Sequence, residues 1–288
     1  MLAERTSDPV PHAFEYQGSR ILYWEYGDPT GRPLLMIHGF RGNHHGLRGV
    51  YSRLPQYRII VPDLPGHGES LPFRDIPHTV AAYAEMVAEF ITATDLDRPV
   101  LLGHSFGSIV AAHVAAVYPD SISDLILVNP IAAKPGQGAL ASIAAARLVE
   151  AYYWLGTNLP DRLSQRMLKS HTWARLMSAA LARTRERSTR RRVIAHHIAD
   201  TTSPQHRRVI AEAFAESITR TALEDAAKIH TRTLLVVGEQ DNVAPLADQR
   251  RLNRTMASSQ LIVVPRQGHL LHLEQPESAA QAIAHFIG

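Results

Sequence analysis

Hydrophobic and polar positions divide the first 129 residues into strand-like and helix-like segments. Short apolar runs bounded by turn-forming residues predict strands, and they lie at 20–26, 33–38, 57–61, 100–102 and 122–128. Residues 79–92 carry apolar side chains at helical spacing, so they predict a helix that crosses over between two strands. The later runs are continuously apolar, which is typical of parallel strands that helices cover on both faces.

From residue 130 to about 229 the strand pattern stops and amphipathic helical segments replace it. Strands are again expected at 233–237 and 260–264, and helices at 246–256 and 276–287. The pattern therefore predicts an α/β protein with a mostly parallel central sheet and helices on both faces. A helical cap, or lid, of residues 130–229 is inserted after the sixth strand, and residues 1–129 and 230–288 form the core.

The charged residues follow the same division of the chain. Residues 130–228 hold 16 Lys and Arg against 8 Asp and Glu, so this segment is positive by eight and the remainder is negative by five. The densest basic run, at 183–192, could attract an anionic substrate, a lipid surface or nucleic acid. No aromatic residues interleave its arginines as a nucleic-acid groove requires, so we expect a solvated helix face and no nucleic-acid partner.

Composition limits the compartment and the possible chemistry. The chain has no cysteine, which excludes disulfides, a thiolate nucleophile and cysteine-based metal sites. Residues 1–12 lack the apolar core of about 7 to 15 residues that a signal peptide has. No stretch approaches the roughly 18 apolar residues of a membrane span. We expect a cytoplasmic protein without stable membrane insertion, and the oligomeric state stays open.

A serine in a G-x-S-x-G motif is the first candidate catalytic residue. Ser105 lies in residues 103–107, directly after one predicted strand and before a predicted helix, where a sharp turn exposes the hydroxyl above the sheet. A serine nucleophile also needs a base and a group that orients the base. Asp241 and His269 each follow a later strand, so all three side chains are expected at the same edge of the sheet.

Five sequence pieces in this order resemble the capped α/β-hydrolases. They are residues 38–40, 63–70, 103–107, 238–241 with Pro245, and 268–269 with 274–276. The resemblance covers nearly the whole chain, and it implies Ser105 as nucleophile, His269 as base and then acid, and Asp241 as orienting carboxylate. The backbone N–H of Phe106, the residue after the nucleophile, is one expected oxyanion donor. By similarity, the N–H of Phe40 is the second.

Other residues compete for these roles, because the chain contains 16 histidines. His272, three residues after His269, is the near rival for the base. We expect structural roles for His38 and His67, which belong to family loop motifs, and for His104, which neighbours the serine.

Two further residues could be taken for the triad acid. Asp63 lies at the turn of the 63–70 loop, and we expect it to hold that loop together. Asn129 occupies the position where some relatives keep their acid, but it cannot ionise, and this favours Asp241.

A metal site is a weaker alternative. His44 and His45, or His196 and His197 with Asp200, could be imagined as ligands, but they match no known ligand spacing. We expect neither a metal nor a cofactor.

The expected function is hydrolysis of a small or medium-sized, largely apolar carboxylic ester through an acyl-enzyme. Tyr152, Tyr153, Trp154 and Trp173 could line an acyl pocket under the lid, although core packing is the competing interpretation of their helical spacing. The first alternative is a carbon–carbon bond hydrolase that acts on a dioxo-acid with the same triad. A second is a non-catalytic ligand-binding protein on a hydrolase scaffold. Relatives that hydrolyse epoxides or haloalkanes use an aspartate where this chain has Ser105.

Overall fold

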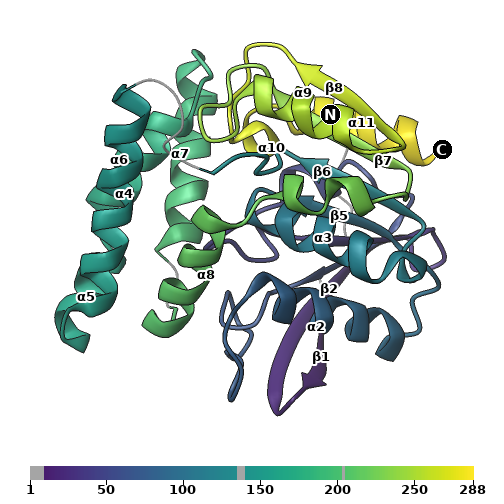
Figure 1. The fold of residues 1–288 in the computed structure, drawn as a ribbon, viewed down its shortest axis with the longest axis horizontal. Coiled ribbons are helices and arrows are strands. Elements are labelled where there is room, and N and C mark those ends of the chain that lie inside the picture. The colour runs from purple at the N-terminus through teal and green to yellow at the C-terminus, as the bar shows by residue number, and fades with distance from the viewer. Residues whose placement is uncertain (1–9, 135–139, 203–204) are drawn as a thin grey trace.

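The computed structural model describes residues 10–134, 140–202 and 205–288. Its centre is an eight-stranded sheet with the order β1-β2-β4-β3-β5-β6-β7-β8, antiparallel at β1, β2 and β4 and parallel from β4 onward (Figure 1). The strands are β1 Val10–Tyr16, β2 Ser19–Gly27, β3 Pro33–Ile37, β4 Arg58–Pro62, β5 Val100–His104, β6 Asp124–Val128, β7 Thr233–Gly238 and β8 Ser259–Val264.

Apolar side chains cover both faces of this sheet, as the continuous apolar runs predict. Alternate residues of β3 belong to different cores: Leu35 and Ile37 pack with the helices α2 and α3, whereas Leu34 and Met36 pack with α11. The core helices are α1 Arg48–Tyr51, α2 Val80–Ala93, α3 Phe106–Val117, α9 Leu246–Thr255, α10 Leu271–Glu274 and α11 Pro276–Ile287. The predicted α/β class is therefore confirmed.

Strand β1 is an element to which the sequence pattern assigned no residues. Phe14 and Tyr16 are buried while Ala13 and Glu15 are exposed, so the strand does show the alternation of a half-buried edge. Pro11 weakened this signal, because proline is depleted in strands. With β1 included, β6 is the sixth strand, and helix α4 is the next helix or strand after it among the described residues.

Where the structure describes the chain between β6 and β7, it contains five α-helices. They are α4 Leu140–Asn158, α5 Asp161–Leu168, α6 His171–Leu181, α7 Arg187–Thr201 and α8 Arg207–Thr219. Helices α7 and α8 lie next to the core, and α4, α5 and α6 lie outside them (Figure 1). We propose residues 140–219, which hold these helices, as the helical part of the cap. Ala213 of α8 packs in the same apolar cluster as α3, as do Ala222, Ala226 and Ile229 after the helices. Among the described residues, no helix is long and apolar enough to cross a bilayer.

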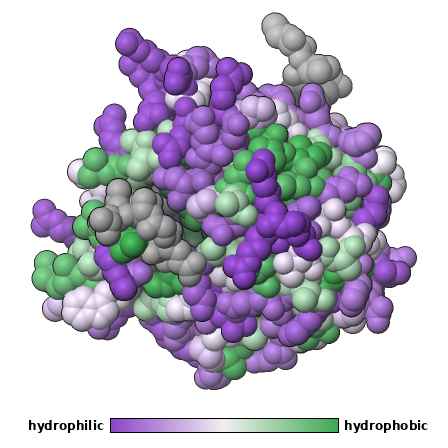
Figure 2. Space-filling view, turned by 45° about the horizontal axis from the view of Figure 1, so that its top comes forward, coloured by the Kyte–Doolittle hydropathy of each residue, from purple (hydrophilic) through white to green (hydrophobic). Residues whose placement is uncertain are grey.

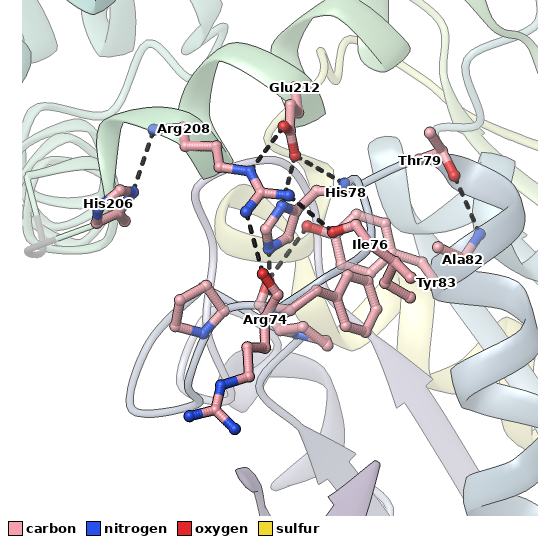
Figure 3. A network of polar contacts seen from close by, with 12 residues as sticks. Arg74, Ile76, His78, Thr79, Ala82, Tyr83, His206, Arg208 and Glu212 are labelled. Carbon is pink, nitrogen blue, oxygen red and sulfur yellow. Dashed lines mark hydrogen bonds and ion pairs between the residues drawn. The ribbon is translucent and has the colours of Figure 1, made fainter. Parts of the chain in front are cut away.

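Helix α8 is fastened to the loop before α2 by a polar network (Figure 3). The Glu212 carboxylate accepts hydrogen bonds from the backbone N–H of His78 at 2.8 Å, from His78 Nδ1 at 2.7 Å and from Arg208 Nε at 2.9 Å. Arg208 also donates to the carbonyl oxygens of Arg74 and Ile76. These contacts fix one side of the cap against the core.

Candidate active site

Ser105 occupies a strained turn between β5 and α3. Its backbone has φ 53° and ψ −118°, a conformation that a residue with a side chain rarely adopts. A Cβ on Gly103 would lie 2.3 Å from the carbonyl oxygen of Gly107, and one on Gly107 would lie 2.4 Å from that of Ile37. The two glycines are therefore required for the strand, the turn and the helix to approach so closely.

His269 and Asp241 reach Ser105 from the loops after β8 and β7. His269 Nε2 lies 2.9 Å from Ser105 Oγ, and His269 Nδ1 lies 2.8 Å from Asp241 Oδ2. The other carboxylate oxygen of Asp241 accepts backbone N–H bonds from Val243 and Ala244, at 2.8 and 3.0 Å. Because both Asp241 oxygens are engaged, the imidazole is held in one orientation.

Asn129 connects the loops that carry these two residues. Its amide nitrogen donates to the carbonyl oxygens of Gly268 and His269, at 3.0 and 2.8 Å, and its amide oxygen accepts from the N–H of Gly238 at 2.8 Å. A carboxylate could not donate these two bonds. The residue at the alternative acid position thus positions the histidine loop.

The loop after β3 lies beside the serine. A Cβ on Gly39 would be 3.3 Å from Ser105 Cβ. His38 Nδ1 and the N–H of Gly42 both bond the Gly39 carbonyl oxygen, at 2.8 and 2.9 Å, and His38 Nε2 accepts from the N–H of Leu64. Because this peptide is trans, the next N–H, that of Phe40, points away from the fixed carbonyl.

Phe106 is the first residue of α3, so its N–H has no acceptor within the helix. Both backbone groups expected to bind an oxyanion therefore belong to segments that adjoin Ser105.

His67, His104 and His272, the other histidines considered for the site, are buried. The ring centroids of His104 and His272 are 3.9 Å apart, and burial lowers the pKa of His104 to about 3. Burial also lowers the pKa of His272 and His67 well below the ordinary value, so both are neutral. The structure brings His269, and not His272, to Ser105.

Asp63 lies away from the serine and joins two loops. It accepts hydrogen bonds from the backbone N–H groups of His44 and Glu69, at 2.6 and 2.8 Å, and from His44 Nδ1 at 3.0 Å. These contacts are those of a residue that holds its loop together.

One ring of each of the two histidine pairs considered as metal ligands is engaged in local contacts. The His44 ring stacks on Trp24 with centroids 3.4 Å apart, and His197 Nδ1 lies 2.7 Å from Ser178 Oγ. In the part of the chain that the structure describes, no three His, Asp or Glu side chains are grouped so that they could hold a metal ion.

The cap aromatics fall into two groups. Tyr152 is buried and stacks on Trp173 with centroids 4.1 Å apart, whereas Trp154 is 68% exposed on the outside of α4. Tyr153 and Phe214 contact Phe40, with ring centroids 5.4 and 5.8 Å away. Of these two residues, Tyr153 was expected near an acyl pocket from its sequence position, whereas Phe214 was expected only as part of an apolar helix face.

Comparisons with known proteins agree with this architecture. The family model described as the alpha/beta hydrolase fold matches residues 32–276. An uncharacterized protein of Mycobacterium tuberculosis is 38% identical over 102 residues, which span 35% of this chain but only 29% of that relative. The 2-hydroxy-6-oxo-2,4-heptadienoate hydrolase of Pseudomonas putida is 25% identical over 264 residues, 90% of each chain. A malate-bound structure of a thermophilic esterase from Thermogutta terrifontis has a TM-score of 0.74 at 28% identity and covers 98% of each chain.

Proposed function

Because this chain belongs to the alpha/beta hydrolase fold family, we propose that it is a serine hydrolase that cleaves a small or medium-sized, largely apolar carboxylic ester. The observation that carries the proposal is the continuous hydrogen-bonded line from Ser105 Oγ through His269 to Asp241, at 2.9 and 2.8 Å. Such a line supplies a nucleophile, a base and an orienting acid within bonding reach of one another.

In the proposed reaction, Ser105 Oγ attacks the ester carbonyl while His269 Nε2 takes the hydroxyl proton. Asp241 fixes the tautomer of the imidazole and stabilises its charged form. The N–H groups of Phe40 and Phe106 bind the negative oxygen of the tetrahedral intermediate. His269 then protonates the departing alcohol, and an acyl-enzyme remains. A water molecule deprotonated by His269 releases the acid and restores Ser105.

The apolar part of the substrate would lie between the core and the cap. We call residues 38–40, in the loop after β3, the oxyanion turn. The rings of Phe40 in this turn and of Tyr153 and Phe214 in the cap contact one another and form a cluster between turn and cap. Closure of the cap over this cluster would exclude water from the acyl part. Tyr152 and Trp173 pack in the same apolar cluster as Phe40 and Tyr153. The exposed Trp154 does not belong to this cluster.

The first alternative is a carbon–carbon bond hydrolase that acts on a dioxo-acid with the same triad. The relative from Pseudomonas putida and the positive charge of the cap favour keeping it. The second alternative, a non-catalytic ligand-binding protein, conflicts with the intact geometry of Ser105, His269 and Asp241. A chromogenic ester assay separates this last alternative from the two enzymes.

The decisive variant is Ser105→Ala. We expect its hydrolysis of short-chain 4-nitrophenyl esters to fall below about 10⁻⁴ of the wild-type rate, because removal of the nucleophile leaves only binding and the oxyanion donors. A fluorophosphonate probe should label the wild type at Ser105 and leave the variant unlabelled. Ser108→Ala is the matched control, since Ser108 lies one helical turn further on and bonds the Ser105 carbonyl and the N–H of Ile131.

Ester hydrolysis that survives Ser105→Ala, or labelling of a residue other than Ser105, would refute the mechanism.

A further inference from the structure

A buried arginine directly follows the oxyanion turn. Arg41 is 3% exposed, and within the described parts of the chain it makes one hydrogen bond, from Nη2 to the carbonyl oxygen of Leu168 at the C-terminus of α5, at 2.9 Å. Its Nε is buried and has no hydrogen-bond partner among residues 10–134, 140–202 and 205–288. Arginine normally uses five N–H donors, so most of the donor capacity of this guanidinium is unused.

In the described structure, no carboxylate is paired with the charge of Arg41. The ionisable groups on which its charge acts include His67, Tyr152 and His197, and none of these three is an acid that is charged at neutral pH. A buried charge without a counter-ion is costly, so the site is electrostatically incomplete.

The position of Arg41 relates this charge to the reacting centre. It lies two residues after Gly39, whose Cα faces the Ser105 side chain. His197, on α7 of the cap, lies near both His269 and Arg41: burial is the main cause that lowers its pKa, and positive charge on either neighbour lowers it further. Arg41 also keeps φ at 58°, a conformation that is costly for a long side chain. The guanidinium is thus held between the oxyanion turn and the cap.

We propose that the guanidinium of Arg41 binds a carboxylate of the substrate, so that the substrate is an ester of largely apolar body that carries one anionic group. This inference rests on the proposed function and narrows its substrate class. The substrate carboxylate would supply the missing counter-charge, and guanidinium and carboxylate match each other geometrically. The bond to Leu168 leaves the other donors of Arg41 available for it.

A purely structural role for Arg41 predicts a different behaviour. The bond to Leu168 also connects the core to the C-terminus of α5, where a positive charge is favourable. If this connection were the whole role of Arg41, its loss would affect neutral and anionic substrates equally. Discrimination between two esters that differ only in charge therefore separates the two roles.

The experiment compares 4-nitrophenyl hexanoate with the 4-nitrophenyl monoester of adipic acid, which has the same acyl length and a terminal carboxylate. The measured quantity is the ratio of kcat/KM for the anionic ester to that for the neutral ester. We expect Arg41→Met to lower this ratio by about 10- to 100-fold, the range of a charge-assisted hydrogen bond. Arg175→Met, which removes an exposed arginine of α6, is the matched control and should leave the ratio unchanged.

Two measurements keep the inference separate from the proposed function. Adipate should slow fluorophosphonate labelling of wild-type Ser105, and hexanamide at the same concentration should slow it less. If the probe labels nothing, the serine mechanism fails, but calorimetric binding of adipate to the wild type and to Arg41→Met still tests the role of Arg41, because the variant should bind adipate about 10- to 100-fold more weakly. An unchanged ratio in Arg41→Met, or a wild type that binds adipate no better than hexanamide, would overturn the inference.

Discussion

Three residues at the candidate site keep backbone conformations that side chains disfavour. Arg41, Ser105 and Asn129 have φ of 58°, 53° and 44°, and they follow the carboxyl ends of the adjacent strands β3, β5 and β6. Strain of this kind persists only where the surrounding structure over-determines it. Here the packing of Gly103 and Gly107 and the bonds of Asn129 supply that constraint.

Asp200, on cap helix α7, is expected to make the stability of the protein depend on pH. Burial raises its pKa to about 6, above the ordinary value of 3.8, and the charge of His196 opposes this shift. Its remaining neighbours are Asn43, with Nδ2 3.5 Å away, and the more distant His44 and Asp63. Between about pH 4 and pH 6 the folded protein therefore binds more protons at this group than the unfolded chain does. The contribution of Asp200 to stability is present below this window and is lost as the pH rises through it.

Asp200→Asn removes this titration. Relative to the wild type, the free energy of unfolding of the variant should rise by about 2 kcal/mol between pH 4 and pH 7. Urea unfolding at several pH values measures it. A difference between the two proteins that stays constant with pH would contradict the prediction.

The basic run shows how helix packing changes the role of a charged segment. Residues 183–186 precede α7, and the helix begins at Arg187. Arg190 donates to the carbonyl oxygens of Ala182 and Ala179, whereas Arg191 and Arg192 are exposed. The expectation of a solvated helix face thus holds for only part of the run, because Arg190 stabilises the turn that ends α6.

The contacts of Glu212 predict how strongly helix α8 stabilises the attachment of the cap to the core. Glu212→Ala removes three hydrogen bonds, among them the one that satisfies the buried His78 ring. We expect the free energy of unfolding to fall by about 2 kcal/mol, because bonds to a charged acceptor are the stronger ones. Protease cleavage within residues 130–228 should accelerate as the cap is released. Urea denaturation and limited proteolysis measure the two effects.

Glu224→Ala is the matched control for this variant. Its carboxylate pairs with Arg220 at 3.2 Å in a partly exposed pair, so its removal should cost less than about 1 kcal/mol. Equal losses in the two variants would mean that α8 is not the fastening point of the cap.

Charge is divided unevenly over the whole molecule, with the inserted segment positive and the remainder negative. On the face drawn in Figure 2, hydrophilic residues cover much of the surface and separate patches of hydrophobic ones. Some arginines of the basic run form hydrogen bonds within the protein. Arg183 donates to the carbonyl oxygen of Gln240 and Arg190 donates to that of Ala182. Fewer arginines are thus free for a polyanion than the sequence suggests.

We expect the protein to elute early from a heparin column, at or below about 0.15 M salt, where the Debye length is about 8 Å. Without aromatic stacking, only screened charges would hold it. Charge reversal at the exposed Arg191 and Arg192 should advance elution further. Retention that persists well above physiological salt would instead favour a nucleic-acid partner.

Local sequence was sufficient for most elements and for the selection of Ser105, Asp241 and His269. Each lies directly after an apolar run, and the carboxyl ends of parallel strands meet at one edge of a sheet, so their convergence could be expected. It was not sufficient for Trp154, which was grouped with Tyr152 although residues two apart on a helix do not share a face, and its side chain is exposed. Spacing along a helix gives a face, and only the neighbouring helices decide whether that face is covered.

The sequence by itself determined the α/β class, the place of the insertion and the glycine-flanked turn at Ser105, because these follow from local periodicity and local steric limits. Tertiary structure alone decided that Asn129 fixes the histidine loop and that Arg41 is buried with no acidic partner in the portion of the chain that the structure describes. Both depend on groups more than a hundred residues away, such as the carbonyls of His269 and Leu168. No local pattern specifies which distant backbone groups a side chain will meet, since that depends on how whole elements pack.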